Sequence, residues 1–212
     1  GLGAIRNVGK NVVSAIIEAR EQKGAFKDFN DFIAKVSAQA CTKRVVEALI
    51  KAGAFDSMGH NRRALMAIHE DAVDAASVTK KNESLGQMDL FGSLEEDTTS
   101  INIPDLPEWT KRDKLAHERE MLGLYVSDHP LSGQEAVLGR NSDSSIAQLL
   151  ARSEVPDGEM LTLAGLITGV NHRIARNSGN PYAAVSVEDF SGEIQVMFMG
   201  KTYAQYKEQL IP

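Results

Sequence analysis

The chain has 212 residues, of which 42% are hydrophobic, and it carries a formal net charge of −6 at pH 7. It contains no apolar run long enough to span a membrane, and its single cysteine, Cys41, excludes an internal disulfide and a cysteine-based metal cluster. The first residues, GLGAIRNVGK, lack an initiator Met and have neither signal nor transit character, so we expect part of a longer, cytoplasmic polypeptide.

The charge is distributed unevenly along the chain. Residues 1–63 hold 11 Lys and Arg against 6 Asp and Glu, which gives +5. Residues 64–109 hold 2 against 10 (−8), and residues 110–212 hold 10 against 13 (−3). The basic N-terminal segment predicts a local surface for a polyanion such as DNA, in spite of the negative total.

Two N-terminal segments resemble each other. VVSAII at 12–17 and VVEALI at 45–50 are each followed by the tripeptide GAF. Their paired apolar residues recur four positions apart, which predicts two amphipathic helices, with Gly53 ending the second in a left-handed conformation. A further helix is expected at about 61–77, and the small core should be filled by Phe26, Phe29, Phe32 and Phe55.

The turn IRNVGKN before the first repeated helix resembles a helix-hairpin-helix DNA-binding motif, with Asn7 at the first hairpin glycine position. Unpaired N–H groups at such a helix start can hold a phosphate. The second copy, QACTKRVV, has no hairpin glycine, so the first copy is the stronger candidate. The candidate DNA contacts are Arg6, Gly9, Lys10, Asn11, Lys43, Arg44, Arg62 and Arg63, and the alternative for the cations is a solvated helical face.

Residues 80–107 have the polar, acidic composition of a linker, and they contain the stretch GQMDLFG at 86–92. Gln87 offers an amide, and Met88, Leu90 and Phe91 offer apolar side chains to a partner's cleft. The segment therefore has the features of a docking peptide. The alternative is that Leu90 and Phe91 fold back onto a neighbouring helix of the same chain.

After a predicted helix over 110–125, the C-terminal part changes to a period of two. HEREM lacks the second His of a zinc-protease motif, and His129 is predicted to be a turn or packing residue. Three antiparallel strands, with a DFSG hairpin turn, and a helix at about 202–210 resemble the first part of an OB-fold. Its candidate DNA contacts, in the loop NHRIARNSGNP between the first two strands, are His172, Arg173 and Arg176, with Tyr182 available for stacking.

In their order, KRVVEALIKAGAFDSMGHNRRALM, GQMDLFG and EREMLGLYVSDHPL resemble the C-terminal region of the bacterial replicative DNA polymerase III alpha subunits. The resemblance covers nearly the whole chain. It implies that Gln87, Met88, Asp89, Leu90 and Phe91 bind the ring-shaped sliding clamp (beta subunit). It also implies double- and single-stranded DNA and other polymerase III holoenzyme subunits as partners, and a parent chain that is a DNA-directed DNA polymerase, a nucleotidyltransferase.

The sequence thus predicts an α+β multidomain chain: tandem helix-hairpin-helix domain (1–79), flexible linker (80–107), connecting helical segment (108–157) and partial OB-fold (158–212). It contains no constellation for catalysis, a metal or a cofactor, so we expect no enzyme activity in this fragment and no membrane partner. The expected function is DNA binding and clamp tethering in replication. The alternatives are the same region of an error-prone paralogue, or a nucleic-acid-binding module of an unrelated enzyme or RNA-binding adaptor.

Overall fold

The computed structural model describes residues 1–84 and 101–211, in two compact units, Gly1–Ser127 and Asp128–Pro212. The peptide predicted to bind the sliding clamp, residues 87–91, lies outside the described residues. Among the helices described, none has the length and hydrophobicity that a membrane crossing needs.

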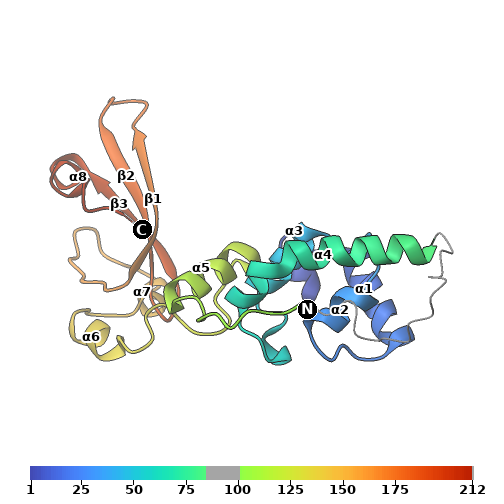
Figure 1. The fold of residues 1–212 in the computed structure, drawn as a ribbon. Helices are drawn as coiled ribbons and strands as arrows, with labels where there is room; N and C mark the ends of the chain where they lie inside the picture. The colour runs from blue at the N-terminus through green and yellow to red at the C-terminus, as the bar shows by residue number, and fades with distance from the viewer. Residues whose placement is uncertain (85–100, 212) are drawn as a thin grey trace. The chain divides into compact units, whose positions relative to one another are not determined.

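The first unit is helical. Its elements are η1 (Leu2–Ala4), α1 (Lys10–Lys23), α2 (Phe29–Lys35), α3 (Lys43–Lys51), η2 (Asp56–Met58), α4 (Arg62–Ser84) and α5 (Lys111–Leu122). The long helix α4 packs against α2 and α3, and α5 packs against α3 (Figure 1). Helix α1 contacts α2 and η1.

The core of this unit is built from the predicted repeat and its aromatic residues. The rings of Phe29 and Phe55 meet edge to face at 5.2 Å, and the ring of Phe32 lies 4.9 Å from Phe55 and 5.1 Å from Phe26. The predicted aromatic core is confirmed. All five apolar residues of the second copy are buried: Val45, Val46, Ala48, Leu49 and Ile50.

The first copy is buried less completely. Ile16 faces the core, but the adjacent Ile17 is 39% exposed. Adjacent residues on a helix point about 100° apart, and α1 is covered on one side by α2 and η1. These two elements cover only one side of α1, so they bury Ile16 and leave the adjacent Ile17 exposed.

Gly53 ends α3 as predicted. Its φ is 79°, and its N–H donates to the carbonyl of Ile50, while the N–H of Ala54 donates to the carbonyl of Leu49. This pair of hydrogen bonds is the Schellman arrangement, which satisfies carbonyls at the end of a helix. Gly53 thereby turns the chain from α3 toward η2 and α4.

The predicted linker over 80–107 differs from the structure at both ends. Helix α4 continues to Ser84, and Ile101, Ile103 and Trp109 pack against the helical core. The carbonyl of Ile101 accepts a hydrogen bond from the side chain of Asn30 at 3.1 Å. Ile101 and Ile103 before Pro104, and Trp109 after Pro107, thus hold this segment against the first unit.

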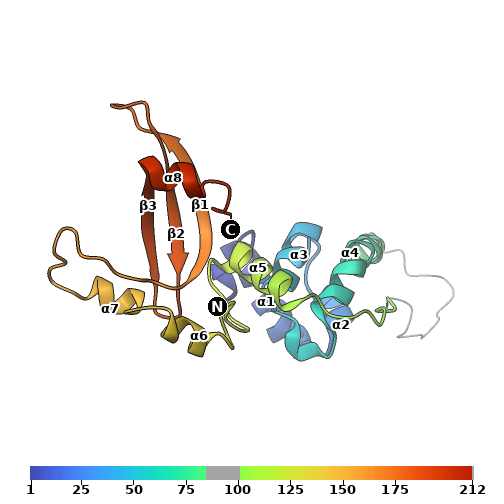
Figure 2. The ribbon, with the colours of Figure 1, turned by 90° about the vertical axis from the view of Figure 1, so that its left-hand side faces the viewer.

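The second unit contains an open sheet. Its elements are α6 (Glu135–Arg140), α7 (Ile146–Leu150), β1 (Leu166–Ile174), β2 (Pro181–Glu188), β3 (Glu193–Met199) and α8 (Gly200–Tyr206). The three strands are antiparallel in the order β1-β2-β3, and α8 packs against β2 and β3 (Figure 2). Ala183, Val185 and Leu210 form its core, with Phe198 packed against them. This confirms the predicted partial OB-like fold.

Candidate nucleic-acid interface

The turn between η1 and α1, residues 5–9, forms a hairpin with an inner and an outer side. Ile5 and Val8 are 6% and 4% exposed and anchor it in the core. Arg6, Asn7 and Gly9 are exposed, as are the next two predicted contact residues, Lys10 and Asn11. The structure therefore gathers four predicted DNA contacts on the outside of one turn: Arg6, Gly9, Lys10 and Asn11.

Asn7 takes the conformation that the hairpin glycine position requires. Its φ is 69°, and it is the one non-glycine residue with a positive φ in the part of the chain that the structure describes. Asparagine enters the left-handed region more readily than most residues with a side chain. The hairpin path is thus kept without a glycine at residue 7.

The start of α1 is open to an anion. Gly9 is its N-cap and supplies no side-chain acceptor, although the first N–H groups of a helix lack partners within the helix. Within residues 1–84 and 101–211, neither Arg6 nor Lys10 forms an ion pair with a carboxylate. Two exposed cations therefore flank a helix start whose N–H groups point outward, an arrangement suited to phosphate.

The start of α3 differs from that of α1. Thr42 is its N-cap, and the Thr42 hydroxyl accepts a hydrogen bond from the N–H of Val45 at 3.3 Å. The side chain of Thr42 therefore occupies a position that a phosphate would otherwise take. This asymmetry agrees with the choice of the first copy as the stronger candidate.

The other predicted cations of the first unit differ in their exposure and ion pairing. Arg44 and Arg63 are exposed. The ammonium of Lys43 lies 2.8 Å from Asp74 and 3.6 Å from Glu70 on α4. The hydrogen bond to Asp74 is the main cause that raises the pKa of Lys43, and burial opposes it.

Arg62 is a structural residue, and we set aside its prediction as a DNA contact. It is 3% exposed. Its Nε and Nη2 donate to the two carboxylate oxygens of Asp56 at 2.8 and 2.7 Å, and its Nη2 lies 2.8 Å from Oε1 of the buried Glu118. Arg62 and the exposed Arg63 are adjacent, and no sequence pattern shows which of the two points inward.

The second unit carries its candidates at one end of the β1–β2 hairpin. His172, Arg173 and Arg176 are exposed, and the turn closes through the N–H of Ala175 and the carbonyl of Asn180 at 2.9 Å. Arg173 pairs in register with Tyr182 on β2, so the two share one sheet face. His172 lies on the other face, where its Nδ1 is 3.1 Å from the hydroxyl of Tyr203. The prediction that one loop gathers the three residues is wrong, because His172 and Arg173 lie in β1 on opposite faces and only Arg176 lies in the loop.

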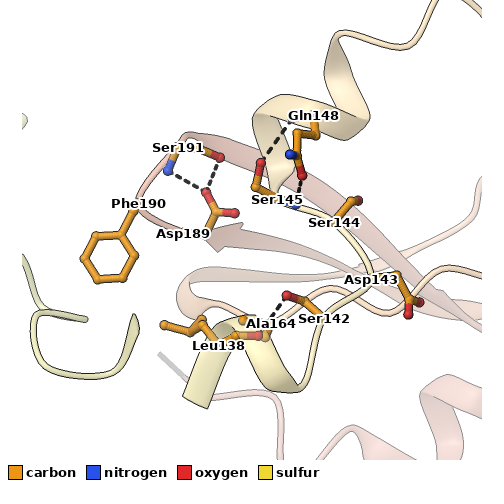
Figure 3. A pocket seen from close by; sticks show the side chains of 11 residues that line it. Leu138, Ser142, Asp143, Ser144, Ser145, Gln148, Ala164, Asp189, Phe190 and Ser191 are labelled. Atoms are coloured by element: carbon orange, nitrogen blue, oxygen red, sulfur yellow. Dashed lines mark hydrogen bonds between the residues drawn. The ribbon is translucent and has the colours of Figure 1, made fainter. Parts of the chain in front are cut away.

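A cavity of about 340 Å³ lies between α6, α7 and the β2–β3 turn (Figure 3). Asp189 and Ser191, on that turn, face the start of α7: Asp189 accepts from the N–H of Ile146 at 2.8 Å, and Ser191 accepts from the N–H of Ala147 at 2.9 Å. These polar groups of the cavity are engaged in holding α7 against the sheet. The Ser144 hydroxyl is buried without a partner among the described residues.

His129 packs as predicted. Its ring lies 4.6 Å from that of Phe190, and its Nδ1 accepts a hydrogen bond from the N–H of Leu131 at 3.1 Å. In the described part of the chain, no group of three or more His, Cys, Asp and Glu residues is placed to hold a metal ion.

Comparison with known proteins gives one family match at the N-terminus and relatives that align with the whole chain. Residues 1–65 match the family described as "Helix-hairpin-helix motif". All of the chain aligns with DNA polymerase III subunit alpha of Mycobacterium tuberculosis (strain H37Rv) at 46% identity over 217 residues, and with that of Mycobacterium leprae at 46% over 214 residues. The identity to the subunit of Pasteurella multocida is 35% over 212 residues, 99% of the chain. The chain spans 18% of the length of each of these relatives.

Proposed function

The chain is related over its whole length to the C-terminal part of DNA polymerase III alpha subunits, and on this basis we propose that it serves DNA replication without catalysing it. In this role it binds DNA and tethers a replicative polymerase to the sliding clamp. Other holoenzyme subunits would be its further partners.

The open start of α1 carries the proposal of DNA binding. A phosphate placed there would meet main-chain N–H groups at the positive end of the helix, with Arg6 and Lys10 as cations on either side. None of these contacts reads a base, so the hairpin would bind duplex DNA without sequence preference. Arg44 and Arg63 are further exposed cations of the same unit.

The peptide QMDLF, Gln87 to Phe91, supports the proposal of clamp tethering through its sequence. Burial of Met88, Leu90 and Phe91 in a cleft would contribute about 1.5–3 kcal/mol each, before the cost of ordering the peptide is subtracted. We therefore expect the peptide to bind the clamp with a dissociation constant of roughly micromolar order. Such a contact becomes effective when DNA held by the same chain raises the local concentration of the clamp.

The exposed face of the sheet supports a role in binding single strands. Tyr182 and Arg173 lie side by side there, so a base could stack on the tyrosine ring while the guanidinium pairs with a phosphate. Arg176, in the following loop, would extend the same contact.

The DNA-binding proposal is tested by titrating a short duplex with the protein and its Lys10→Ala variant at several salt concentrations. We expect weaker binding and a salt slope reduced by about 1 in the variant. Lys43→Ala is the matched control, because Lys43 is already paired with Asp74 and Glu70. If the salt slope of duplex binding is the same for Lys10→Ala as for the wild type, Lys10 makes no phosphate contact and the hairpin has only a structural role.

The tether is tested by titrating a purified sliding clamp with the protein and with a Leu90→Ala, Phe91→Ala double variant. A Leu85→Ala, Leu94→Ala double variant removes apolar residues outside the pentapeptide and serves as the control. Binding should be lost in the first variant and kept in the second. Equal affinities of the wild type and the Leu90→Ala, Phe91→Ala variant would overturn the tether.

A further inference from the structure

We propose that Glu118 is a positioning residue for the DNA-binding hairpin, which it orients through the C-terminal end of α5. The inference rests on the proposed DNA binding by the hairpin. Glu118 is fully buried and does not reach the surface itself, so it would act only through the groups that it holds.

The hairpin is joined to α5 by a main-chain hydrogen bond. The N–H of Arg6 donates to the carbonyl of Met121 at 2.8 Å. Met121 lies in the last turn of α5, where carbonyls have no partner within the helix, so this carbonyl is available to the hairpin. Arg6 immediately precedes Asn7, the residue with positive φ. The bond therefore fixes the hairpin at the point where its chain reverses.

Glu118 holds the same end of α5. It precedes Met121 by three residues, so the two share one face of the helix. Its Oε2 accepts from the N–H groups of Val126 and Ser127 at 2.7 and 2.9 Å, which folds the chain after α5 back onto the helix. Its Oε1 lies 2.8 Å from Nη2 of Arg62.

Arg62 extends this network to the rest of the first unit. Besides the two bonds to Asp56, its Nη1 donates to the carbonyl of Lys51 at the end of α3, at 3.2 Å. Glu118 thus connects α5 with the end of α3, with η2 and with the start of α4. Burial opposes ionisation of Glu118, but the hydrogen bonds from the N–H groups of Ser127 and Val126 and the nearby guanidinium of Arg62 outweigh it and lower its pKa.

The network has a direct consequence for the phosphate site. The N–H groups at the start of α1 bind an anion best when they are held in place before the anion arrives. If Glu118 loses its charge, the end of α5 and the Met121 carbonyl become less fixed, and the hairpin loses an anchor. DNA affinity should then fall although no cation has been removed.

The test compares Glu118→Gln with Glu120→Gln, a change of the same type at an exposed residue of the same helix. We expect the Arg6 amide of Glu118→Gln to exchange with solvent about tenfold faster than in the wild type. Duplex affinity should fall by about threefold to tenfold with the salt slope unchanged, because the number of phosphate contacts stays the same. Glu120→Gln should leave both quantities at the wild-type value.

Wild-type exchange of the Arg6 amide and wild-type affinity in a folded Glu118→Gln protein would overturn the inference. If Glu118→Gln does not fold, Asp56→Asn changes the network at a carboxylate that is 44% exposed, and its Arg6 amide should also exchange faster. An unchanged exchange rate of the Arg6 amide in Asp56→Asn would overturn the inference as well. The outcome is separable from the proposed function, because Lys10→Ala tests DNA binding through the salt slope, whereas amide exchange is measured without DNA.

Discussion

Gly53 and Arg62 lie in direct contact, and a Cβ atom added to Gly53 would overlap the guanidinium of Arg62. The same guanidinium is held by Asp56 and Glu118, so it has little room to move aside. The tripeptide GAF at 53–55 therefore has a requirement that its earlier copy at 24–26 does not share, because an added Cβ at Gly24 would meet open space.

Gly53→Ala should lower the free energy of unfolding by about 2–4 kcal/mol, from the cost of a positive φ and from the overlap with Arg62. Gly59→Ala is the matched control, with a φ of 86° and open space around the added Cβ. Its cost should be about 1 kcal/mol. Urea unfolding of both variants measures the difference. Equal costs would show that Arg62 shifts freely and that the contact is unimportant for stability.

Gly9→Asp should change stability and DNA binding in opposite directions. Gly9 has φ −76° and ψ 167°, which any residue adopts, and an added Cβ meets open space. An aspartate there would cap α1 and stabilise the protein by up to about 1 kcal/mol.

The same carboxylate would occupy the N–H groups proposed for phosphate and repel DNA, so duplex affinity should fall by about tenfold or more. Thermal unfolding and DNA titration of one preparation test both parts. Gly9→Asn is the control, because it offers a cap of the same size without the charge and should lose less affinity. Unchanged DNA affinity in Gly9→Asp would exclude the helix start from the interface.

Asp189 should make the second unit sensitive to acid. Burial of its carboxylate opposes ionisation, but hydrogen bonds from Ser191, Ile146 and Gly192 outweigh burial and lower its pKa from 3.8. A carboxylate with a lowered pKa in the folded state contributes stability above its unfolded pKa and loses it as the pH falls through the folded value.

Asp189→Asn should therefore destabilise the second unit at pH 7 by about 1–3 kcal/mol, and the difference from wild type should shrink below about pH 4. Thermal unfolding from pH 7 to pH 2 measures this. Asp157→Asn, at an exposed residue of the same unit, should match the wild type throughout. A constant difference at all pH values would show that shape rather than charge holds the turn.

Arg173→Ala combined with Arg176→Ala should weaken binding of a single-stranded oligonucleotide and reduce its salt slope by about 1–1.5. Lys201→Ala combined with Lys207→Ala removes the same charge from exposed residues of the same unit and should have a smaller effect. Fluorescence anisotropy at several salt concentrations separates the two. Equal losses would indicate a general charge effect rather than a site on β1 and its loop.

The helical repeat, the aromatic core and the three-stranded sheet were predictable from the sequence because each depends on local periodicity or turn chemistry. The buried position of Arg62 was not, because it is set by Glu118, which lies 56 residues further along the chain. The packing of Ile101 and Ile103 was missed for a related reason: two apolar residues before a proline show no period, and the Ile101 carbonyl is bonded to Asn30, which lies 71 residues earlier in the chain. Prediction thus failed where long-range contacts decide the outcome.

The attachment of α4 and of residues 101–109 to α2 has a mechanical consequence. The side chain of Lys80, near the end of α4, donates hydrogen bonds to the carbonyls of Ile33 and Val36. The side chain of Asn30 donates to the carbonyl of Ile101. The residues on both sides of 85–100 are thus hydrogen-bonded to α2 or to its C-cap. A force that pulls on residues 85–100 would therefore act first on the hydrogen bonds of Lys80 and Asn30.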